Sequence, residues 1–217
     1  MYALALLLVF AFFVYRTSIR QHAEVAVIPK RISDRLGRLW DIAHQGMREN
    51  RFLRAEKALL TILKIDEKNA AAYNRLGILY AKQKEYKDAI DCFEIASSIE
   101  PTASSLHNLG LIYYETENYH KAATAFEQAL KLEDSLAARH IAYAKVQEKL
   151  GNDKLMLLEL EKAVELEPNP ETLSLLHRAY ESKDMTEEAH ITEHKLKTLV
   201  MPTGRPKKVL RAKRVVI

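Results

Sequence analysis

The chain has 217 residues, 48% of them hydrophobic and 29% charged, a balance typical of a folded rather than a disordered protein. Six glycines and six prolines are too few for the turns of an all-β sandwich, and the frequent Ala, Leu, Glu and Lys favour helices. The single cysteine, Cys92, excludes an internal disulfide and any metal site built on a cysteine pair.

Charge is distributed unevenly along the chain, whose net charge is +4. Residues 16–38 hold six basic and two acidic side chains, and residues 200–217 hold six basic side chains and no acidic one. The stretch between them, residues 39–199, therefore carries a net charge of −6. The sequence thus describes an acidic body between two basic flanks.

The first fifteen residues, MYALALLLVFAFFVY, contain no charge and no helix breaker. As a helix they would span roughly 22 Å, which is short of a hydrocarbon core of ~30 Å. Extension to residue 19, with Arg16 and Arg20 reaching the headgroups, closes most of that gap. We therefore expect a transmembrane anchor over residues 1–19 and a basic juxtamembrane linker over residues 20–35. A cleaved signal peptide and a buried helix remain alternatives for the apolar segment.

The basic residues near this segment all follow it in the chain. Because Lys and Arg flanks stay on the cytoplasmic side, the pattern predicts a single-pass membrane protein with its amino terminus outside. The rest of the chain would then lie in the cytoplasm.

Two stretches of the chain follow one pattern. YNRLGILYAKQKEYKDAIDCFEIA (residues 73–96) and LHNLGLIYYETENYHKAATAFEQA (residues 106–129) begin 33 residues apart. The same frame extends in both directions, and each repeat holds two apolar stretches with helical spacing. The sequence therefore predicts an all-α array of about five helix-turn-helix repeats. We place these repeats at residues 36–69, 70–102, 103–136, 137–169 and 170–199.

Small residues recur at fixed places in the repeats. Gly77 and Gly110 lie in the middle of predicted first helices, where glycine costs about 1 kcal/mol relative to alanine. We therefore expect each of them to mark the close approach of a second helix, at an interaxial distance of about 8–10 Å. Phe93 and Phe126 are expected to fill the space between these helices.

These residues resemble the tetratricopeptide repeat over about residues 36–199. The second repeat matches the family pattern at nine positions: Tyr73, Leu76, Gly77, Tyr80, Tyr86, Ala89, Phe93, Ala96 and Pro101. The third repeat is nearly as close, with Asp134 in place of the proline, and the outer repeats depart further, as capping repeats do. The resemblance implies a right-handed α-solenoid whose concave groove, lined mainly by the first helix of each repeat, binds a protein or peptide partner.

Helical phase gives a set of candidate partner-binding residues that flank the packed side of each first helix. They are Trp40, His44, Asn74, Arg75, Ile78, Lys82, Ser104, His107, Asn108, Leu111, Ile141, Lys145 and Lys149. Asn side chains can bond a peptide backbone, and Arg or Lys can meet a carboxylate. The alternative for any one of them is an ordinary solvated helix face.

Some members of the family grip the acidic carboxyl terminus of heat-shock chaperones with a clamp of Lys, Asn and Arg residues. Asn108 fits the middle position of this clamp, but Ile78 occupies the Asn position of the preceding repeat. Ala138 and Ala142 stand where the Lys and Arg of the next repeat would be. The clamp is incomplete, so we do not expect binding of chaperone tails.

The stretch HITEH, residues 190–194, matches the H-x-x-E-H pattern of inverted zinc proteases. Two histidines four residues apart share a helix face, but zinc needs a third protein ligand, and no Asp or Glu follows Glu193. We expect a solvated helix face and no metal site. Because no phosphate-binding loop, nucleophile elbow or paired carboxylate was found elsewhere, we expect no enzymatic activity, no cofactor and no small-molecule substrate.

The basic tail, residues 200–217, could contact anionic lipid or RNA phosphates, although it lacks an aromatic residue for base stacking. A disordered solubilising tail is the alternative. Together these features predict a membrane-anchored scaffold or adaptor that binds a protein or peptide partner in its groove. The alternative function is an RNA- or ribosome-associated membrane factor that acts through its tail.

Overall fold

The computed structural model describes residues 30–200, and within that range the chain forms ten α-helices and divides into two compact units. The N-terminal unit ends at Glu67 and the C-terminal unit begins at Lys68. The fold is an all-α helical repeat, as the sequence predicts. The right-handed sense of the array remains a prediction.

The N-terminal unit contains one helix pair in its described part, α2 (Lys30–Arg48) and α3 (Phe52–Ile65). The two helices lie close where α2 ends: a Cβ added at Gly46 would lie 3.0 Å from Cβ of Ala55. On α3, one side is buried through Ala55, Ala58, Leu59 and Ile62.

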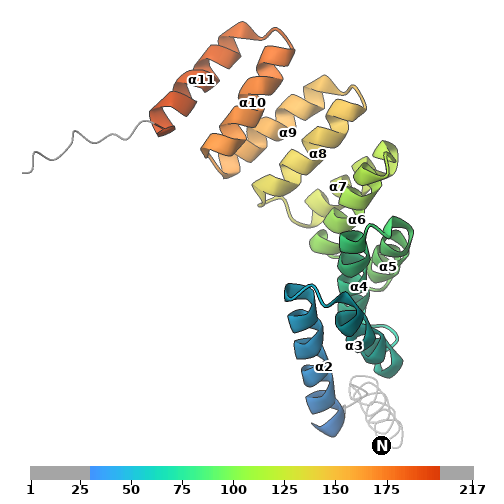
Figure 1. Ribbon diagram of the computed structural model, residues 1–217. Coiled ribbons are helices and arrows are strands. Elements are labelled where there is room, and N and C mark those ends of the chain that lie inside the picture. Colours follow the sequence, from blue (N-terminus) through green and yellow to red (C-terminus); the bar gives the residue numbers. More distant parts are fainter. Residues whose placement is uncertain (1–29, 201–217) are drawn as a thin grey trace, which may run out of the picture. The chain divides into compact units, whose positions relative to one another are not determined.

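The C-terminal unit contains four further helix pairs, and each helix packs against the next one in the chain (Figure 1). The pairs are α4 (Ala70–Gln83) with α5 (Tyr86–Ile99), α6 (Ala103–Glu115) with α7 (Tyr119–Leu132), α8 (Ala137–Lys149) with α9 (Asp153–Leu166), and α10 (Pro170–Ser182) with α11 (Thr186–Val200). The first helices also meet directly, α4 with α6 and α6 with α8.

Each pair turns through a residue in the left-handed backbone region, directly after or near the end of its first helix. These residues are Asn50, Lys84, Glu117, Gly151 and Asp184, spaced by 33 or 34 residues. In the second pair of the described chain, the Glu85 N–H then donates to the Tyr80 carbonyl at 2.9 Å, which satisfies a carbonyl at the helix end. The repeat is therefore visible in the backbone as well as in the side chains.

The core of the C-terminal unit runs between the helices of these pairs. Phe93 and Phe126 are 1% and 0% exposed, and both lie directly against a glycine of the preceding helix. A Cβ added at Gly77 would come within 2.6 Å of the Phe93 ring, and one added at Gly110 within 2.9 Å of the Phe126 ring. The expectation that these glycines mark close helix contacts is confirmed.

The pair α8–α9 differs from its neighbours because its core is partly polar. His140 and Glu159 are 3% and 4% exposed, and the His140 Nδ1 lies 2.6 Å from Glu159 Oε2. The His140 Nε2 lies 2.8 Å from the carbonyl oxygen of Asp134. At the same helix end, buried Arg139 donates to the Glu133 carboxylate at 3.0 Å. The contacts with Asp134 and Glu133 hold the α7–α8 connection, where Asp134 stands at the position of Pro101 in the preceding repeat.

The structure corrects the predicted localisation. No helix within residues 30–200 is long and apolar enough to cross a membrane, which takes about 20 apolar residues. Helices α3 to α11 have only 13–15 residues, and α2, with 19, contains seven charged side chains. The predicted anchor, residues 1–19, and most of the linker and basic tail lie outside the described residues. The single-pass topology with a cytoplasmic array is therefore not retained.

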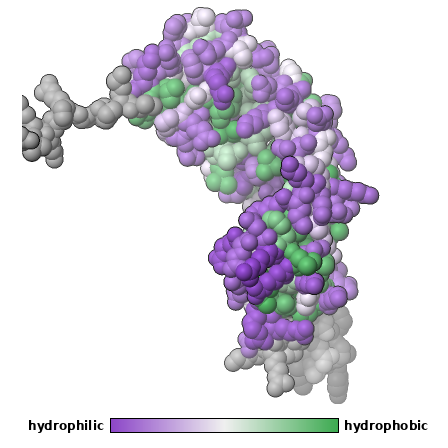
Figure 2. All heavy atoms as spheres, in the orientation of Figure 1, coloured by the Kyte–Doolittle hydropathy of each residue, from purple (hydrophilic) through white to green (hydrophobic). Residues whose placement is uncertain are grey.

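The face drawn in Figure 2 is mainly hydrophilic. On the face drawn in Figure 2, apolar side chains reach the surface in separate patches between hydrophilic residues. Exposed large apolar residues of the C-terminal unit include Leu111 on α6 (38% exposed) and Leu132 on α7 (54%). Single exposed apolar residues are normal on soluble surfaces, so a binding surface has to be argued from cavities and their chemistry.

Candidate partner-binding face

One position of the repeat lies beside a surface cavity on every first helix of the C-terminal unit. It is occupied by Ile78 on α4, Leu111 on α6, Lys145 on α8 and Arg178 on α10. The four residues are spaced by 33, 34 and 33 positions, so they are equivalent in the repeat. We call the exposed surface of α4, α6, α8 and α10 around these residues the first-helix face.

The first cavity on this face lies between α4 and α6 and has a volume of about 250 Å³. Ile78 and Ala81 of α4 face Leu111 and Ile112 of α6 across it, and Phe93 of α5 forms its floor. Lys82 and Asn108 are the polar residues of the lining. This cavity can take an apolar side chain.

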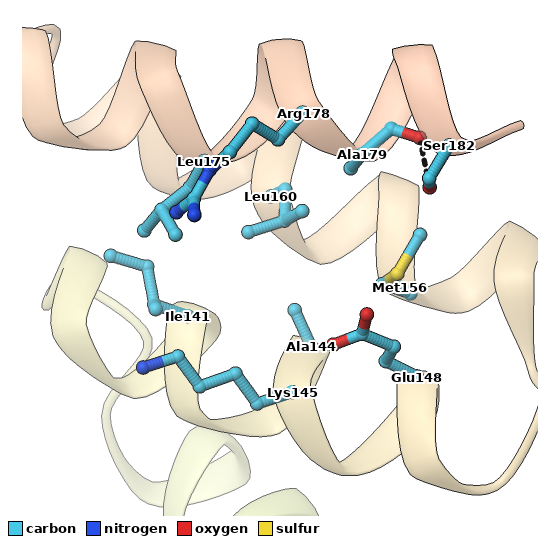
Figure 3. A pocket seen from close by; sticks show the side chains of 10 residues that line it. All are labelled: Ile141, Ala144, Lys145, Glu148, Met156, Leu160, Leu175, Arg178, Ala179 and Ser182. Carbon is cyan, nitrogen blue, oxygen red and sulfur yellow. Dashed lines mark hydrogen bonds between the residues drawn. The ribbon is translucent and has the colours of Figure 1, made fainter.

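The second cavity lies between α8 and α10, two repeats further along, and has a volume of about 290 Å³ (Figure 3). Its floor is apolar and buried, with Met156 and Leu160 of α9 exposed by only 3% and 7%. The remaining lining residues come from the two first helices: Ile141, Ala144, Lys145 and Glu148 from α8, and Leu175, Arg178, Ala179 and Ser182 from α10. The Ser182 hydroxyl donates to the Ala179 carbonyl at 2.8 Å.

Charge is arranged asymmetrically around the second cavity. Figure 3 shows the Lys145 ammonium and the Arg178 guanidinium at the same end, while the Glu148 carboxylate lies toward the other end, near Met156. Lys145 and Arg178 are exposed, and neither forms an ion pair with another residue of the described part of the chain. The cationic end is therefore free to meet a carboxylate.

The two cavities are equivalent in the repeat but differ in chemistry. Phe93 and Leu160 form their floors and lie 67 residues apart, which is two repeats. The rim position that is Ile78 and Leu111 in the first cavity is Lys145 and Arg178 in the second. The fold supplies the same hollow twice, and at this shared rim position the sequence has apolar side chains in the first cavity and cations in the second.

Two predicted residues are brought together between α4 and α6. The Asn108 Nδ2 donates to Asn74 Oδ1 at 3.3 Å, so part of the hydrogen-bonding capacity of both side chains is used inside the protein. Arg75, Lys82, Ser104 and Lys149 are exposed on the first helices. These four side chains can reach a partner without breaking a contact that holds the helices.

His107 is packed more deeply than its helical phase suggests. Its ring meets the Phe126 ring edge-on, with centroids 5.3 Å apart, and its Nδ1 is buried without a hydrogen-bond partner among the described residues. Burial, and to a smaller extent the nearby Arg139 charge, lowers the pKa of His107. The His107 ring therefore serves mainly to pack α6 against α7, and little of it is available to a partner.

Trp40 and His44 belong to α2 of the N-terminal unit. Both are half-buried, and their rings contact each other with centroids 5.7 Å apart. An apolar hollow of this unit is lined by Leu39 and Ile42 of α2 and by Leu53 and Ala58 of α3 among others.

The predicted partner-binding set contains no residue of the last repeat, and the structure adds Leu175 and Arg178 of α10 to the face. A signal for Arg178 was present, since it follows Lys145 by 33 residues, the repeat length. Extending the helical phase by one more repeat would have found it. The contributions of Met156 and Leu160, which lie on a second helix, follow only from the packing.

The described residues were also compared with the sequence patterns of metal and nucleophile sites. Within residues 30–200, no group of three His, Cys, Asp or Glu side chains is placed to hold a metal ion. In the HITEH stretch, Glu193 pairs with Lys197 at 2.6 Å, and that hydrogen bond and charge lower the pKa of its carboxyl. Burial raises the pKa of the half-buried Cys92 thiol to about 11, with Asp88 and Asp91 adding to the effect, so it is a poor nucleophile at neutral pH.

Comparison with solved structures identifies the same fold in other proteins. The chain is similar to the crystal structure of the MamA protein, with 21% identity and a TM-score of 0.68 over 76% of this chain and 92% of that one. It is similar to MamA residues 41 to the end from Desulfovibrio magneticus RS-1, with 17% identity and a TM-score of 0.69 over 76% and 95%. It is also similar to YrrB, described as a tetratricopeptide protein with an unusual peptide-binding site, with 19% identity and a TM-score of 0.64 over 85% and 91%.

A search of curated proteins found no significant match. In the scan against protein families, residues 70–102 match the tetratricopeptide repeat, and residues 101–167 match it through a second family model. The resemblance inferred from the repeating Leu, Gly, Ala and Phe residues is confirmed for this part of the chain. Residues 70–167, which form helices α4 to α9, are tetratricopeptide repeats.

Proposed function

We propose that the protein is a scaffold that binds an extended segment of another protein along its first-helix face. The observation that carries this proposal is the pair of cavities that recur two repeats apart between neighbouring first helices. An extended peptide laid across these helices could place one side chain in each cavity. YrrB, which has the same fold, is described as having a peptide-binding site.

The proposed scaffold comprises the five repeats within residues 36–199, with the bounds given above. In the C-terminal unit its binding surface consists of Arg75, Ile78, Lys82, Leu111, Ile141, Lys145 and Lys149, with Arg178 added from α10. These residues combine exposed cations with apolar hollows, so polar and apolar contacts are available to one ligand. We infer no catalytic role for any of them.

The test is a selection from a library of random twelve-residue peptides, using the full-length protein as bait. Selected peptides are then measured against a variant in which Arg75, Lys82, Leu111 and Lys145 are changed to alanine. If each lost contact is worth about 1 kcal/mol, the four changes weaken binding at least a hundredfold, which corresponds to about 2.7 kcal/mol. These four side chains are exposed, so helix content by circular dichroism should be unchanged.

The matched control changes Lys87, Asp91, Gln128 and Lys154 to alanine, four exposed residues on the second helices α5, α7 and α9. This variant should bind the selected peptides within about threefold of the wild type, since exposed charges far from a ligand act weakly. Selection of no peptide, or loss of binding in the control set alone, would refute the proposal.

A further inference from the structure

The two equivalent cavities fit different side chains of a peptide that lies across the first-helix face. At the shared rim position, the α4–α6 cavity has Ile78 and Leu111, whereas the α8–α10 cavity has Lys145 and Arg178. A ligand that fits one cavity therefore does not fit the other equally well. The α4–α6 and α8–α10 cavities therefore select different side chains of a ligand.

The second cavity demands both an apolar and an anionic group. Its floor of Met156, Leu160, Ala144 and Ala179 is buried and offers no hydrogen-bonding side chain to a ligand. An apolar side chain must fill it, so the ligand backbone has to run across the rim. There it meets two cations that lack a carboxylate partner among the described residues. Charge complementarity selects a carboxylate beside the inserted side chain.

The two ends of the second cavity differ in charge, and this determines the end at which a ligand carboxylate lies. The ammonium of Lys145 and the guanidinium of Arg178 lie at the end of the cavity near Ile141 and Leu175, and Glu148 lies toward the other end (Figure 3). A carboxylate is attracted to the first end and repelled from the second. The ligand backbone crosses the rim of the cavity and can continue beyond it. The carboxylate can therefore belong to an acidic side chain within the peptide rather than to the end of a chain.

We propose that the α8–α10 cavity is a subsite for an acidic side chain that neighbours an apolar one, in an extended peptide whose other anchor is an apolar side chain in the α4–α6 cavity. This inference rests on the proposed function of the first-helix face and specifies the chemical class of its ligand. Two steps between neighbouring first helices, at about 10 Å each, separate the cavities by roughly 20 Å, or about six residues of extended chain.

The test uses the full-length protein and a library of random twelve-residue peptides with amidated carboxyl termini. Selected peptides should be enriched in Asp or Glu beside an apolar residue, with a second apolar position about six residues away. In fluorescence anisotropy, changing that Asp to Asn in a selected peptide should weaken binding to the wild-type protein at least tenfold. The same peptide pair should bind Lys145→Gln/Arg178→Gln with nearly equal affinity.

Charge reversal gives a gain-of-function arm. The variant Lys145→Glu/Arg178→Glu should prefer peptides with Lys or Arg at the former acidic position. The control Lys87→Glu/Lys154→Glu makes the same change in net charge on the exposed sides of α5 and α9 and should keep the acidic preference. This comparison separates a local subsite from the field of the whole protein.

The outcomes separate this inference from the proposed function. Peptides that bind the first-helix face without any acidic preference would overturn the subsite and leave the scaffold function intact. Binding only of peptides with a free carboxyl terminus, in a parallel library, would also overturn it, since the ligand would then be a chain end. An acidic preference that persists in Lys145→Glu/Arg178→Glu would place the anion elsewhere. Selection of no peptide at all would refute both proposals.

Discussion

At the scale of single residues, two glycines set how closely the helices of a pair approach. Gly77 lies against the buried Phe93 ring, and an added Cβ would come within 2.6 Å of it. Gly77→Val should therefore lower the free energy of unfolding by about 1–3 kcal/mol, as overpacked core positions do. Chemical denaturation followed by circular dichroism measures the change.

The control for this substitution is Gly37→Ala. A Cβ at Gly37 on α2 meets no atom within 4 Å, so only helix propensity acts there, and the change should stabilise α2 by up to about 1 kcal/mol. A Gly77→Val variant as stable as the wild type would show that the Phe93 ring moves freely and that the contact is not tight.

His107 gives the molecule a pH dependence of predictable sign. Burial lowers its pKa, so the unfolded chain binds a proton near pH 6.5 more readily than the folded chain does. Its contribution to stability is present at neutral pH and is lost as the pH falls through the pKa of the unfolded state. The unfolding free energy of the His107→Leu variant should therefore decline less between pH 7 and pH 5 than that of the wild type.

Denaturation curves at four pH values measure this slope, and His120→Leu, at an exposed position of α7, is the control. A steeper decline for His107→Leu than for the wild type would contradict the burial of this ring against Phe126.

At the scale of elements, the turns within the helix pairs carry backbone strain. Four of the five left-handed turn residues are not glycine, and a left-handed conformation costs a residue with a Cβ roughly 1–2 kcal/mol. Glu117→Gly should therefore stabilise the α6–α7 pair by about 1 kcal/mol, because glycine adopts φ of 58° without a Cβ clash. The converse change, Gly151→Ala at φ of 74°, should cost a similar amount. If Glu117→Gly lowers the melting temperature, the turn is held by side-chain contacts rather than by the backbone.

The α8–α9 pair depends on a buried polar contact that its neighbours lack. In the adjacent repeats, Leu106 and Leu173 stand at the position of His140, and Ala125 stands at that of Glu159. Glu159→Ala alone should cost about 1–3 kcal/mol because it leaves the buried Nδ1 of His140 without its hydrogen-bond partner. The double variant His140→Leu/Glu159→Ala restores the neighbouring pattern and should cost much less. A double-mutant cycle in urea measures the coupling, and additive losses would argue against a direct interaction.

Much of this architecture could be predicted from the sequence, and the reasons are local. The spacing of Gly77, Phe93, Gly110 and Phe126 indicated paired helices and their contacts, because these residues serve one purpose in every repeat. The partnership of His140 with Glu159 could not be predicted, since it occurs once and joins two helices across a pair. The left-handed turn residues share no residue type, so only the backbone reveals them.

At the scale of the whole molecule, residues chosen by helical phase have different surroundings on the first-helix face. Helical phase placed Ile78, Leu111 and Lys145 beside the packed side of the first helices, and in the structure each of them lines a cavity. It placed His107 on the open surface, but the His107 ring packs edge-on against the Phe126 ring between α6 and α7. The predicted localisation was wrong. It rested on residues 1–19, which lie outside the described residues, and no helix within residues 30–200 is long and apolar enough to cross a membrane.

Site-specific photo-crosslinking tests most directly whether a peptide lies across the first-helix face. Benzoylphenylalanine is placed at Leu111, which is 38% exposed and lines the α4–α6 cavity, and in a second variant at Lys87, which is exposed on α5. A peptide selected on the wild-type protein is then irradiated with each variant, and the adducts are mapped by mass spectrometry. We expect an adduct at position 111 that excess unlabelled peptide abolishes, and none at position 87. Efficient crosslinking at position 87 with none at position 111 would contradict it.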